Sequence, residues 1–423
     1  MKISEVRVTP IAFRDPPLLN ASGIHEPYAL RSVIEVKGEN GITGLSETYG
    51  DANVLTALQV IAPALKGINV HDLNGLRKLI KTEAKNIAPS DIGIDLAPGS
   101  QPSKIAANVY SAFEVAFLDL QARSLEVPLV ALLGGAIRHE IPFSAYLFFK
   151  YAEHIGKPYA ADPWGEALNA HQIVEQARRM IDCYGFQSIK LKAGVLEPEQ
   201  EAECIKALRQ AFPEHPLRID PNANWSLETA IRISKLIRDD LEYYEDPTPR
   251  LEGMADLHRE TGVPLATNMV VTNFDEFRRS VELNAVQIVL SDHHYWGGLR
   301  DTLQLARMCE TFGVGISMHS NSHLGISLMA MSHVAAACEN LSYACDTHYP
   351  WQEEDEEIIQ GGKVPIKNGC VQITESPGLG VELDRERLEK QHQLYVEIDI
   401  RSRDDGAQMK KYDPSWQLIK PRF

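Results

Sequence analysis

The feature that most constrains the fold is a series of short apolar runs that recurs along the middle of the chain. From about residue 140, eight runs each end in a polar residue and alternate with amphipathic segments of helix length; the polar residues are Tyr146, Lys192, Asp220, Glu245, Asn268, Asp292, His319 and His348. Their separations are 46, 28, 25, 23, 24, 27 and 29 residues, and all but the first match one βα unit. This alternation predicts a (β/α) barrel, with an active site at the carboxyl ends of its strands.

The first 50 residues follow a different pattern. KISEVRVTPIAF and SVIEVKGENGITGLSET alternate apolar and polar residues, and ENG marks a tight turn. Helical periodicity follows in VLTALQVIAPALKG and SKIAANVYSAFEVAFLDLQARSLEV. Because 423 residues exceed the usual size of one core, we predict several parts. They are an α+β capping domain over 1–138, a barrel over 139–362 and a C-terminal segment over 363–423 that packs back on the capping domain.

Composition restricts the possible partners. The excess of 58 acidic over 42 basic residues gives a net charge of −16, which argues against general binding of nucleic acid. It does not exclude an anionic small molecule, because a local cluster of cations can override the overall field. The six cysteines form no CxxC pair, and the start MKISEVRVTPIAF lacks the features of a signal peptide. With no apolar stretch of membrane-spanning length, we expect a cytoplasmic protein that contacts no membrane.

Three of the strand-end residues offer hard oxygen ligands. Asp220, Glu245 and Asn268 follow three consecutive runs, so they would meet at one rim of the barrel. A single acidic residue at a strand end is more often a helix cap. Three in register, on rigid elements with open positions for water or substrate, favour Mg²⁺ over Zn²⁺.

The run SIKLKAG places two lysines on the same face of a strand. Lys190 and Lys192 are two residues apart, so both side chains point the same way. Lysines that protect a solvent-facing edge are one explanation. The alternative is an electrostatic site, in which a lysine near a second cation and a metal loses proton affinity and can act as a base.

The sixth and seventh runs end in a second candidate base. Asp292 and His319 would lie on neighbouring strands, where a carboxylate–imidazole hydrogen bond raises the basicity of the histidine. Two bases on opposite sides of one metal suit removal of the proton next to a carboxylate. Three nearby histidines, His293, His294 and His323, raise the possibility of zinc, but the oxygen-ligand set favours a structural role for His323.

These motifs resemble the enolase superfamily, its mandelate racemase subgroup and, within it, the glucarate dehydratase family. The likeness spans nearly the whole chain and includes LLNASGIH, YLFF, RIDPNANW, HSNSH, DTH and SRDDGAQM. It implies an α/β fold, a (β/α)7β modified TIM barrel with an α+β capping domain. It also implies Mg²⁺ held by Asp220, Glu245 and Asn268. The Asn within ATNMV is typical of glucarate dehydratases, since many relatives have an acidic residue there.

The resemblance also implies roles for single residues. Lys192 corresponds to the base for a carbon of S configuration. His319, paired with Asp292, corresponds to the base for R configuration and assists the leaving hydroxyl. Lys190 would contact the metal-bound carboxylate. The substrate-binding positions would be Asn20, His25, Tyr146, Lys190, Asn222, Asn268, Ser320, Asn321, His348 and Arg403. The planar fork of Arg403 suits a distal carboxylate.

Some stretches depart from the family pattern. Ile105 occupies the place of a substrate-contacting Thr, and the loop over 87–102 is longer than usual. We therefore predict a Mg²⁺-dependent dehydratase of an acid sugar, with D-glucarate as the leading substrate and L-idarate next. A racemase or epimerase of a related acid sugar is the first alternative, and a silent aldarate-binding paralogue is the second. We expect a homo-oligomer whose partner is a small dicarboxylate.

Overall fold

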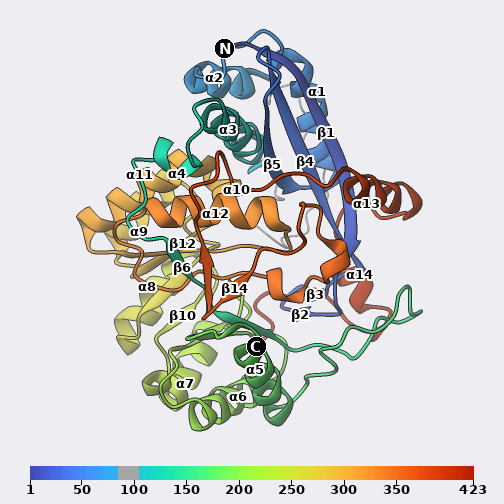
Figure 1. Ribbon diagram of the computed structural model, residues 1–423. Helices are drawn as coiled ribbons and strands as arrows, with labels where there is room; N and C mark the ends of the chain where they lie inside the picture. Colours follow the sequence, from blue (N-terminus) through green and yellow to red (C-terminus); the bar gives the residue numbers. More distant parts are fainter. Residues whose placement is uncertain (84–103) are drawn as a thin grey trace.

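The computed structural model describes residues 1–83 and 104–423. Its N-terminal part is an antiparallel sheet in the order β1-β4-β5, formed by β1 (Ile3–Arg14), β4 (Tyr28–Gly38) and β5 (Thr43–Tyr49). The predicted turn between β4 and β5 is present: Gly38 N donates to Ile42 O at 2.9 Å, and Gly41 has the positive φ of 84° that glycine tolerates. This sheet lies at the end of the molecule that carries the N-terminus (Figure 1).

Helices and a small hairpin complete the capping part. Helices α1 (Ala52–Ile61), α2 (Leu73–Glu83) and α3 (Ile105–Ser124) are followed by the short α4 (Leu129–Leu132). Helix α3 packs against both β5 and the other helices, and it is therefore buried along most of its length. The loop LLNASGIH forms the hairpin of β2 (Leu19–Asn20) and β3 (Gly23–Ile24).

The second part is a curled sheet of seven parallel strands in sequential order. These strands are β7 (Ala145–Phe148), β8 (Ile189–Lys192), β9 (Leu217–Asp220), β10 (Tyr243–Glu245), β11 (Leu265–Thr267), β12 (Ile288–Ser291) and β13 (Gly315–Met318). Nearly every strand residue is buried, as expected when the inner face packs in a barrel and the outer face lies under helices. The sheet and its helices confirm the predicted fold class.

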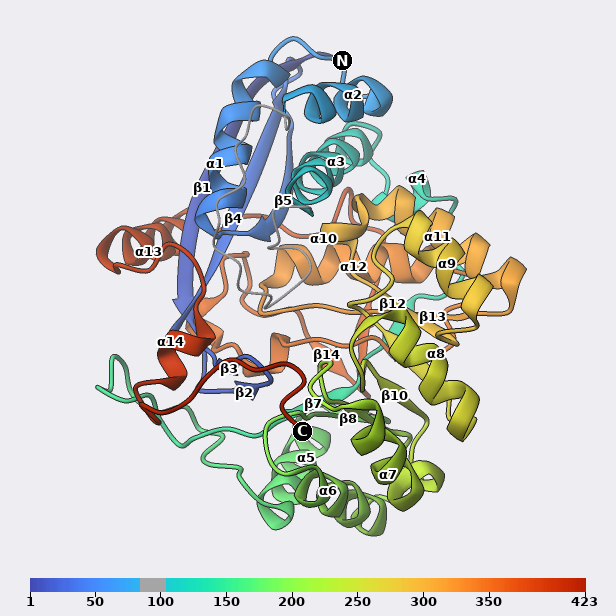
Figure 2. The same cartoon turned by 180° about the vertical axis from the view of Figure 1, so that it is seen from behind.

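One or more helices follow each strand, and Figure 2 shows several of them along the outside of the sheet. They are α5 (Ala170–Tyr184), α6 (Pro198–Ala211), α7 (Leu227–Ile237), α8 (Arg250–Thr261), α9 (Phe274–Leu283), α10 (His293–Trp296), α11 (Gly298–Phe312) and α12 (Gly325–Ala337). Side-chain caps fix several of these helices: Asn169, Ser226 and Asn273 each accept a hydrogen bond from a backbone N–H three residues on.

The eighth apolar run differs from a regular strand. LSYACDTH forms isolated bridges, in which Leu341 pairs with Ile316 of β13 and Cys345 pairs with Phe143 just before β7. Backbone hydrogen bonds continue on both sides, from Asp346 N to Met318 O at 2.9 Å and from Cys345 N to Pro142 O at 2.8 Å. The run therefore links the two edges of the sheet and brings its polar residues to the same rim as the other seven.

The C-terminal segment contacts both parts. Strands β14 (Ile366–Lys367) and β15 (Cys370–Gln372) join β6 (Glu140–Pro142) next to the barrel. Helix α13 (Arg385–Glu397) packs on β1, and α14 (Asp405–Met409) packs on β3. The tail therefore packs partly on the capping part and partly beside the barrel. The predicted domain bounds remain a prediction. No helix within the described residues is long and apolar enough to cross a membrane.

A buried carboxyl group joins the two parts. Glu114 of α3 accepts hydrogen bonds from the backbone N–H of Leu299 at 2.7 Å and of Arg300 at 3.3 Å, in the first turn of α11. Gly298 is needed here, because its φ is +95° and a Cβ atom would lie 2.0 Å from the Glu114 carboxyl. The capping part therefore contacts the barrel through hydrogen bonds as well as apolar packing.

Candidate active site

A pocket opens at the carboxyl ends of the strands, next to the β2–β3 hairpin. Ten residues predicted from the sequence line it: Asn20, His25, Tyr146, Lys192, Asn222, Asn268, His319, Asn321, His348 and Arg403. Phe148 and Met269 complete the lining. Residues from the first 25 positions, six barrel segments and the tail thus meet around one pocket.

Strand register arranges the central residues in two layers. Tyr146, Lys190 and Arg218 are Cα partners on β7, β8 and β9, and Lys192 pairs in the same way with Asp220. Lys190 is fully buried and Lys192 is 7% exposed. The explanation of SIKLKAG as a protective edge strand is therefore excluded.

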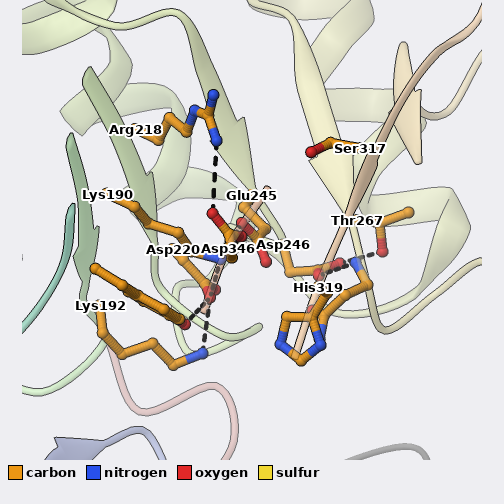
Figure 3. A network of polar contacts seen from close by, with 12 residues as sticks. Lys190, Lys192, Arg218, Asp220, Glu245, Asp246, Thr267, Ser317, His319 and Asp346 are labelled. Atoms are coloured by element: carbon orange, nitrogen blue, oxygen red, sulfur yellow. Dashed lines mark hydrogen bonds and ion pairs between the residues drawn. The ribbon is translucent and has the colours of Figure 1, made fainter. Parts of the chain in front are cut away.

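Lys190 lies within a cluster of carboxylates (Figure 3). Its Nζ is 2.5 Å from Oε2 of Glu245, 2.7 Å from Oδ2 of Asp346 and 3.5 Å from Oδ2 of Asp220. Burial alone would lower the pKa of Lys190, but the carboxylates of Asp346 and Glu245 raise it well above its ordinary value. Lys190 is thus a fixed cation, suited to holding negative charge.

Lys192 makes a simpler contact. Its Nζ lies 2.7 Å from Oδ2 of Asp220, and the side chain continues into the pocket. Burial alone would raise the pKa of Asp220, but Lys192 and Lys190 lower it to about 2. Asp220 is therefore an ionised oxygen donor at the floor of the pocket.

The oxygens of Glu245 and Asn268 fit a metal ion. Neither carboxylate oxygen of Glu245 has a hydrogen-bond partner, although Lys190 makes an ion pair with one of them, and Oδ1 of Asn268 also has none among the described residues. Burial and the nearby Asp220 raise the pKa of Glu245 well above its usual range. Buried oxygens without donors, next to a second carboxylate, are what a divalent cation would satisfy.

Neighbouring side chains hold Asn268 in place. Its backbone N–H donates to Oδ2 of Asp246 at 2.9 Å, and its carbonyl accepts from Tyr295 OH at 3.0 Å. Asp246 itself has a φ of 40°, and Asn222 after the preceding strand has a φ of 55°. Asp and Asn tolerate this left-handed backbone better than other non-glycine residues, and such positions recur at functional sites.

Asp292 and His319 form the predicted pair. Oδ2 of Asp292 lies 3.4 Å from Nδ1 of His319 and 3.3 Å from the hydroxyl of Tyr49. Burial lowers the pKa of His319, an effect that Asp292 opposes only partly, so the resting imidazole is neutral. Because Nδ1 faces the carboxylate, Nε2 is left as the proton acceptor toward the pocket.

The predicted substrate-binding residues are held by partners that the sequence did not reveal. Nε and NH2 of Arg403 donate to the two oxygens of Asp405 at 2.7 and 2.6 Å, and Asn20 donates to the same carboxylate at 2.6 Å. Nδ1 of His25 lies 3.0 Å from Oδ2 of Asp15. Both pocket residues from the hairpin are therefore fixed by a buried carboxylate.

Five of the predicted site residues do not line the pocket: Lys190, Asp220, Glu245, Asp292 and Ser320. The first four are buried in the polar contacts described above. Ser320 donates to Asp346 O at 3.3 Å and is absent from the pocket lining, and Ile105 is buried in the core at the start of α3. The long loop over 87–102 lies outside the described residues. His323, considered as a zinc ligand, instead faces the hydroxyl of Thr347 at 2.9 Å.

Asp346 and Arg218 are central residues that the sequence interpretation missed. Asp346 contacts Lys190 and, at 3.5 Å, NH1 of Arg218, whose Nε donates to Glu242 at 2.7 Å. The available signal for Asp346 was its place in CDTH at a strand-end position, where His348 was selected instead. For Arg218 the signal was a cation two residues before Asp220, on the same face of a buried strand.

Comparison with known proteins gives the family. Residues 5–134 match the N-terminal domain of mandelate racemase and muconate lactonizing enzyme, and residues 172–387 match the enolase C-terminal domain-like family. The chain belongs to the enolase superfamily. Enzymes of this superfamily are magnesium-dependent, and the relatives place this member among the hydro-lyases.

Three relatives of this superfamily member are informative. A protein of Streptomyces coelicolor described as a probable glucarate dehydratase is 48% identical over 98% of this chain and 97% of its own length. A solved enolase of Pseudomonas fluorescens, with bound magnesium, potassium and tartrate, is 67% identical, with a TM-score of 0.98 over 100% of this chain and 99% of its own. A solved enolase of Thermobispora bispora, with magnesium and formate, is 48% identical, with a TM-score of 0.94 over both full chains.

Proposed function

We propose that this enzyme dehydrates an acid sugar with two carboxylates, and that D-glucarate is its leading substrate. The observation that carries the proposal is that two candidate bases, Lys192 and His319, line one pocket together with Asn268 and Arg403. The bases come from β8 and β13, which are well separated in the strand order. They can therefore reach opposite faces of one carbon, between oxygen ligands at one end and a guanidinium at the other.

In the proposed reaction, Lys192 in its neutral form removes the α-proton from a carbon of S configuration, and His319 removes it from a carbon of R configuration. The electrons of the broken C–H bond delocalise into the adjacent carboxylate to form an enolate. Its negative charge would lie near the fixed cation of Lys190. When His319 is the base, its imidazolium gives the abstracted proton to the departing β-hydroxyl. When Lys192 is the base, His319 first takes a proton from solvent, and the Lys192 ammonium returns one to solvent. In both routes water leaves and an enol remains. The enol then tautomerises to a keto-deoxy-aldarate.

Magnesium fits the oxygen donors described above. We propose that Asp220, Glu245 and Asn268 would hold it, and that when bound it neutralises charge on the reacting carboxylate. Lys192 lies 2.7 Å from Asp220, so the proposed base and the proposed metal ligand share one carboxylate.

Substrate identity is proposed from the two ends of the pocket. Arg403 provides a cation for a distal carboxylate, and Asn20, His25 and His348 provide polar groups for hydroxyls. The name of the Streptomyces relative and the tartrate in the Pseudomonas enolase, a hydroxylated diacid, support this class. L-idarate, an epimer of D-glucarate, is the second candidate substrate.

The same two bases favour one further candidate, a racemase or epimerase of a related acid sugar. An enolate between two bases can take its proton back from the other face. Purified protein with Mg²⁺ should form keto acid from one or more diacid sugars. Deuterium incorporation from ²H₂O without formation of keto acid would favour epimerisation. Inactivity toward every diacid sugar tested would leave only an aldarate-binding role.

Assembly and location remain predictions. We propose a homo-oligomer that acts in the cytoplasm and binds no nucleic acid. Light scattering coupled to gel filtration tests the first part, and a single 47.2 kDa species would overturn it.

A further inference from the structure

The Asp292–His319 pair continues to a second histidine. Oδ1 of Asp292 accepts hydrogen bonds from the backbone N–H of His294 at 3.0 Å and lies 2.6 Å from Nδ1 of the same residue. The distance from Oδ2 to His319 Nδ1 is longer, at 3.4 Å. Asp292 is therefore held more tightly by His294 than by the proposed base.

Arg31 decides which nitrogen of His294 carries the proton. NH2 of Arg31 lies 2.9 Å from Nε2 of His294, and a guanidinium can only donate. Nε2 must then be the acceptor, and the single proton of a neutral His294 is on Nδ1, pointing at Asp292. Ser327 Oγ, also 2.9 Å from Nε2, can donate to the same acceptor.

The capping sheet fixes Arg31 in turn. Arg31 of β4 donates through Nε to Oε1 of Glu47 on β5 at 2.9 Å. Glu47 also accepts from the backbone N–H of Leu324 at 2.9 Å and of Ser327 at 3.0 Å, at the start of α12. Arg31, Glu47 and His294 are each at most 2% exposed, so water does not compete for these bonds.

This geometry excludes a simpler use of the cluster. Ligand atoms of Asp292, His293 and His294 lie within 4.8 Å of one another, a spacing that could hold a cation. The guanidinium of Arg31 already faces the outer nitrogen of His294, which makes the position unfavourable for a second positive charge. The cluster is better explained by hydrogen bonding than by metal binding.

We propose that His294 is a positioning residue that keeps Asp292 ionised and directs its Oδ2 at His319. The donor from Nδ1 fixes the plane of the carboxylate, and the buried Arg31–Glu47 pair fixes the tautomer of His294. His319 then keeps its proton on Nδ1 and its free Nε2 toward the pocket. The effect of His294 on catalysis by His319 rests on the proposed function. The tautomer of His294, with its proton on Nδ1, does not.

The catalytic test separates the two bases. His294→Phe keeps a planar ring and removes the donor, and His294→Asn restores a donor near the Nδ1 position. We expect His294→Phe to slow α-proton exchange with ²H₂O at the R-configured carbon by about tenfold or more. Exchange at the S-configured carbon, which uses Lys192, should change much less, and His294→Asn should recover most of the loss.

A matched control measures the cost of changing a buried histidine. His333 of α12 is equally buried but faces Val130 N and Leu379 O, outside the site. His333→Phe should leave the ratio of the two exchange rates unchanged. Equal losses at both carbons in His294→Phe, no loss at either, or the same ratio change in His333→Phe would overturn the positioning role.

A second measurement needs no substrate. In enzyme with ¹⁵N-labelled histidine, the resonances that disappear in His294→Phe report the tautomer of His294. We expect a protonated Nδ1 and an unprotonated Nε2 in the resting enzyme. A protonated Nε2 would overturn the inference even if aldarates react. If no aldarate reacts, the proposed function fails and the tautomer alone decides the inference.

Discussion

The Nζ of Lys190 and Oδ2 of Asp346 lie 2.7 Å apart, while Oδ1 of Asp346 lies 3.5 Å from NH1 of Arg218. One buried carboxylate thus links two buried cations beneath the pocket (Figure 3). Its partners come from β8 and β9, whereas Asp346 comes from the run that links the two edges of the sheet. The relationship couples barrel closure to the position of Lys190, the cation that we propose contacts the reacting carboxylate.

Asp346→Asn should therefore impair turnover more than folding. Asn keeps the volume but removes the charge that fixes Lys190, so we expect kcat/KM for the preferred diacid to fall by about tenfold to a hundredfold, roughly 1.4 to 2.7 kcal/mol. Steady-state kinetics measure the loss. Glu242→Gln is the control, because Glu242 contacts Arg218 but not Lys190. Unchanged kinetics in Asp346→Asn would contradict the coupling.

Metal binding should appear as a gain in stability. A ligand that binds only the folded state at a hundred times its Kd adds about 2.7 kcal/mol, so Mg²⁺ should raise the melting temperature. Glu245→Gln removes a proposed ligand charge and should abolish most of this shift. Asn268→Asp, which keeps an oxygen and adds a charge, should retain it. Scanning fluorimetry measures the melting temperature of each variant. A full Mg²⁺-induced rise in the melting temperature of Glu245→Gln would show that the ion binds elsewhere.

The two bases should be separable by substrate configuration. Lys192→Ala should lose about 10²- to 10⁴-fold of the rate of α-proton exchange at an S-configured carbon, and His319→Ala should show the corresponding loss at an R-configured carbon. Proton NMR in ²H₂O with two epimeric aldarates measures both rates. Circular dichroism must show folded protein in each case. Equal losses of both exchange reactions in both variants would mean that the role assignment is wrong.

The sequence predicted the parts of the site that follow the barrel repeat. Asp220, Glu245 and Asn268 each end an apolar run, so the period alone brings them to one rim. The lysine pair and its burial follow from strand alternation once the run is placed inside a barrel. The resemblance to a family then supplied roles that spacing cannot give.

Other parts depend on contacts between distant segments. Asp405 fixes both Arg403 and Asn20. Asn20 and Asp405 are 385 positions apart in the sequence, so no local pattern predicts their contact. The tautomer of His294 depends on Arg31 from another sheet. Asp346 was missed because its run ends in CDTH, where more than one polar residue could mark the strand end and His348 was selected. The structure shows that Asp346 is the one that contacts Lys190.

The Glu114 contact between the two parts predicts a pH-dependent stability. Burial is the main cause that raises the pKa of Glu114 to about 7, from an ordinary value of 4.5. The folded protein thus holds a proton that the unfolded chain releases. Its contribution is fully present below pH 4.5 and is lost as the pH rises toward 7, a change of about 3 kcal/mol.

Denaturation at pH 5 and pH 8 tests this contribution. The free energy of unfolding of the wild type should fall between these values by more than that of Glu114→Gln, since Gln stays neutral while its carbonyl can still accept from Leu299 N. The difference between the two slopes isolates Glu114 from other titrating groups, including Glu201, whose pKa is also raised by burial to about 7. Glu339→Gln, at an exposed position, is the control and should keep the wild-type slope. Parallel pH profiles of wild type and Glu114→Gln would show that this carboxyl group is ionised in the folded protein, and that the bonds to α11 are those of a charged acceptor.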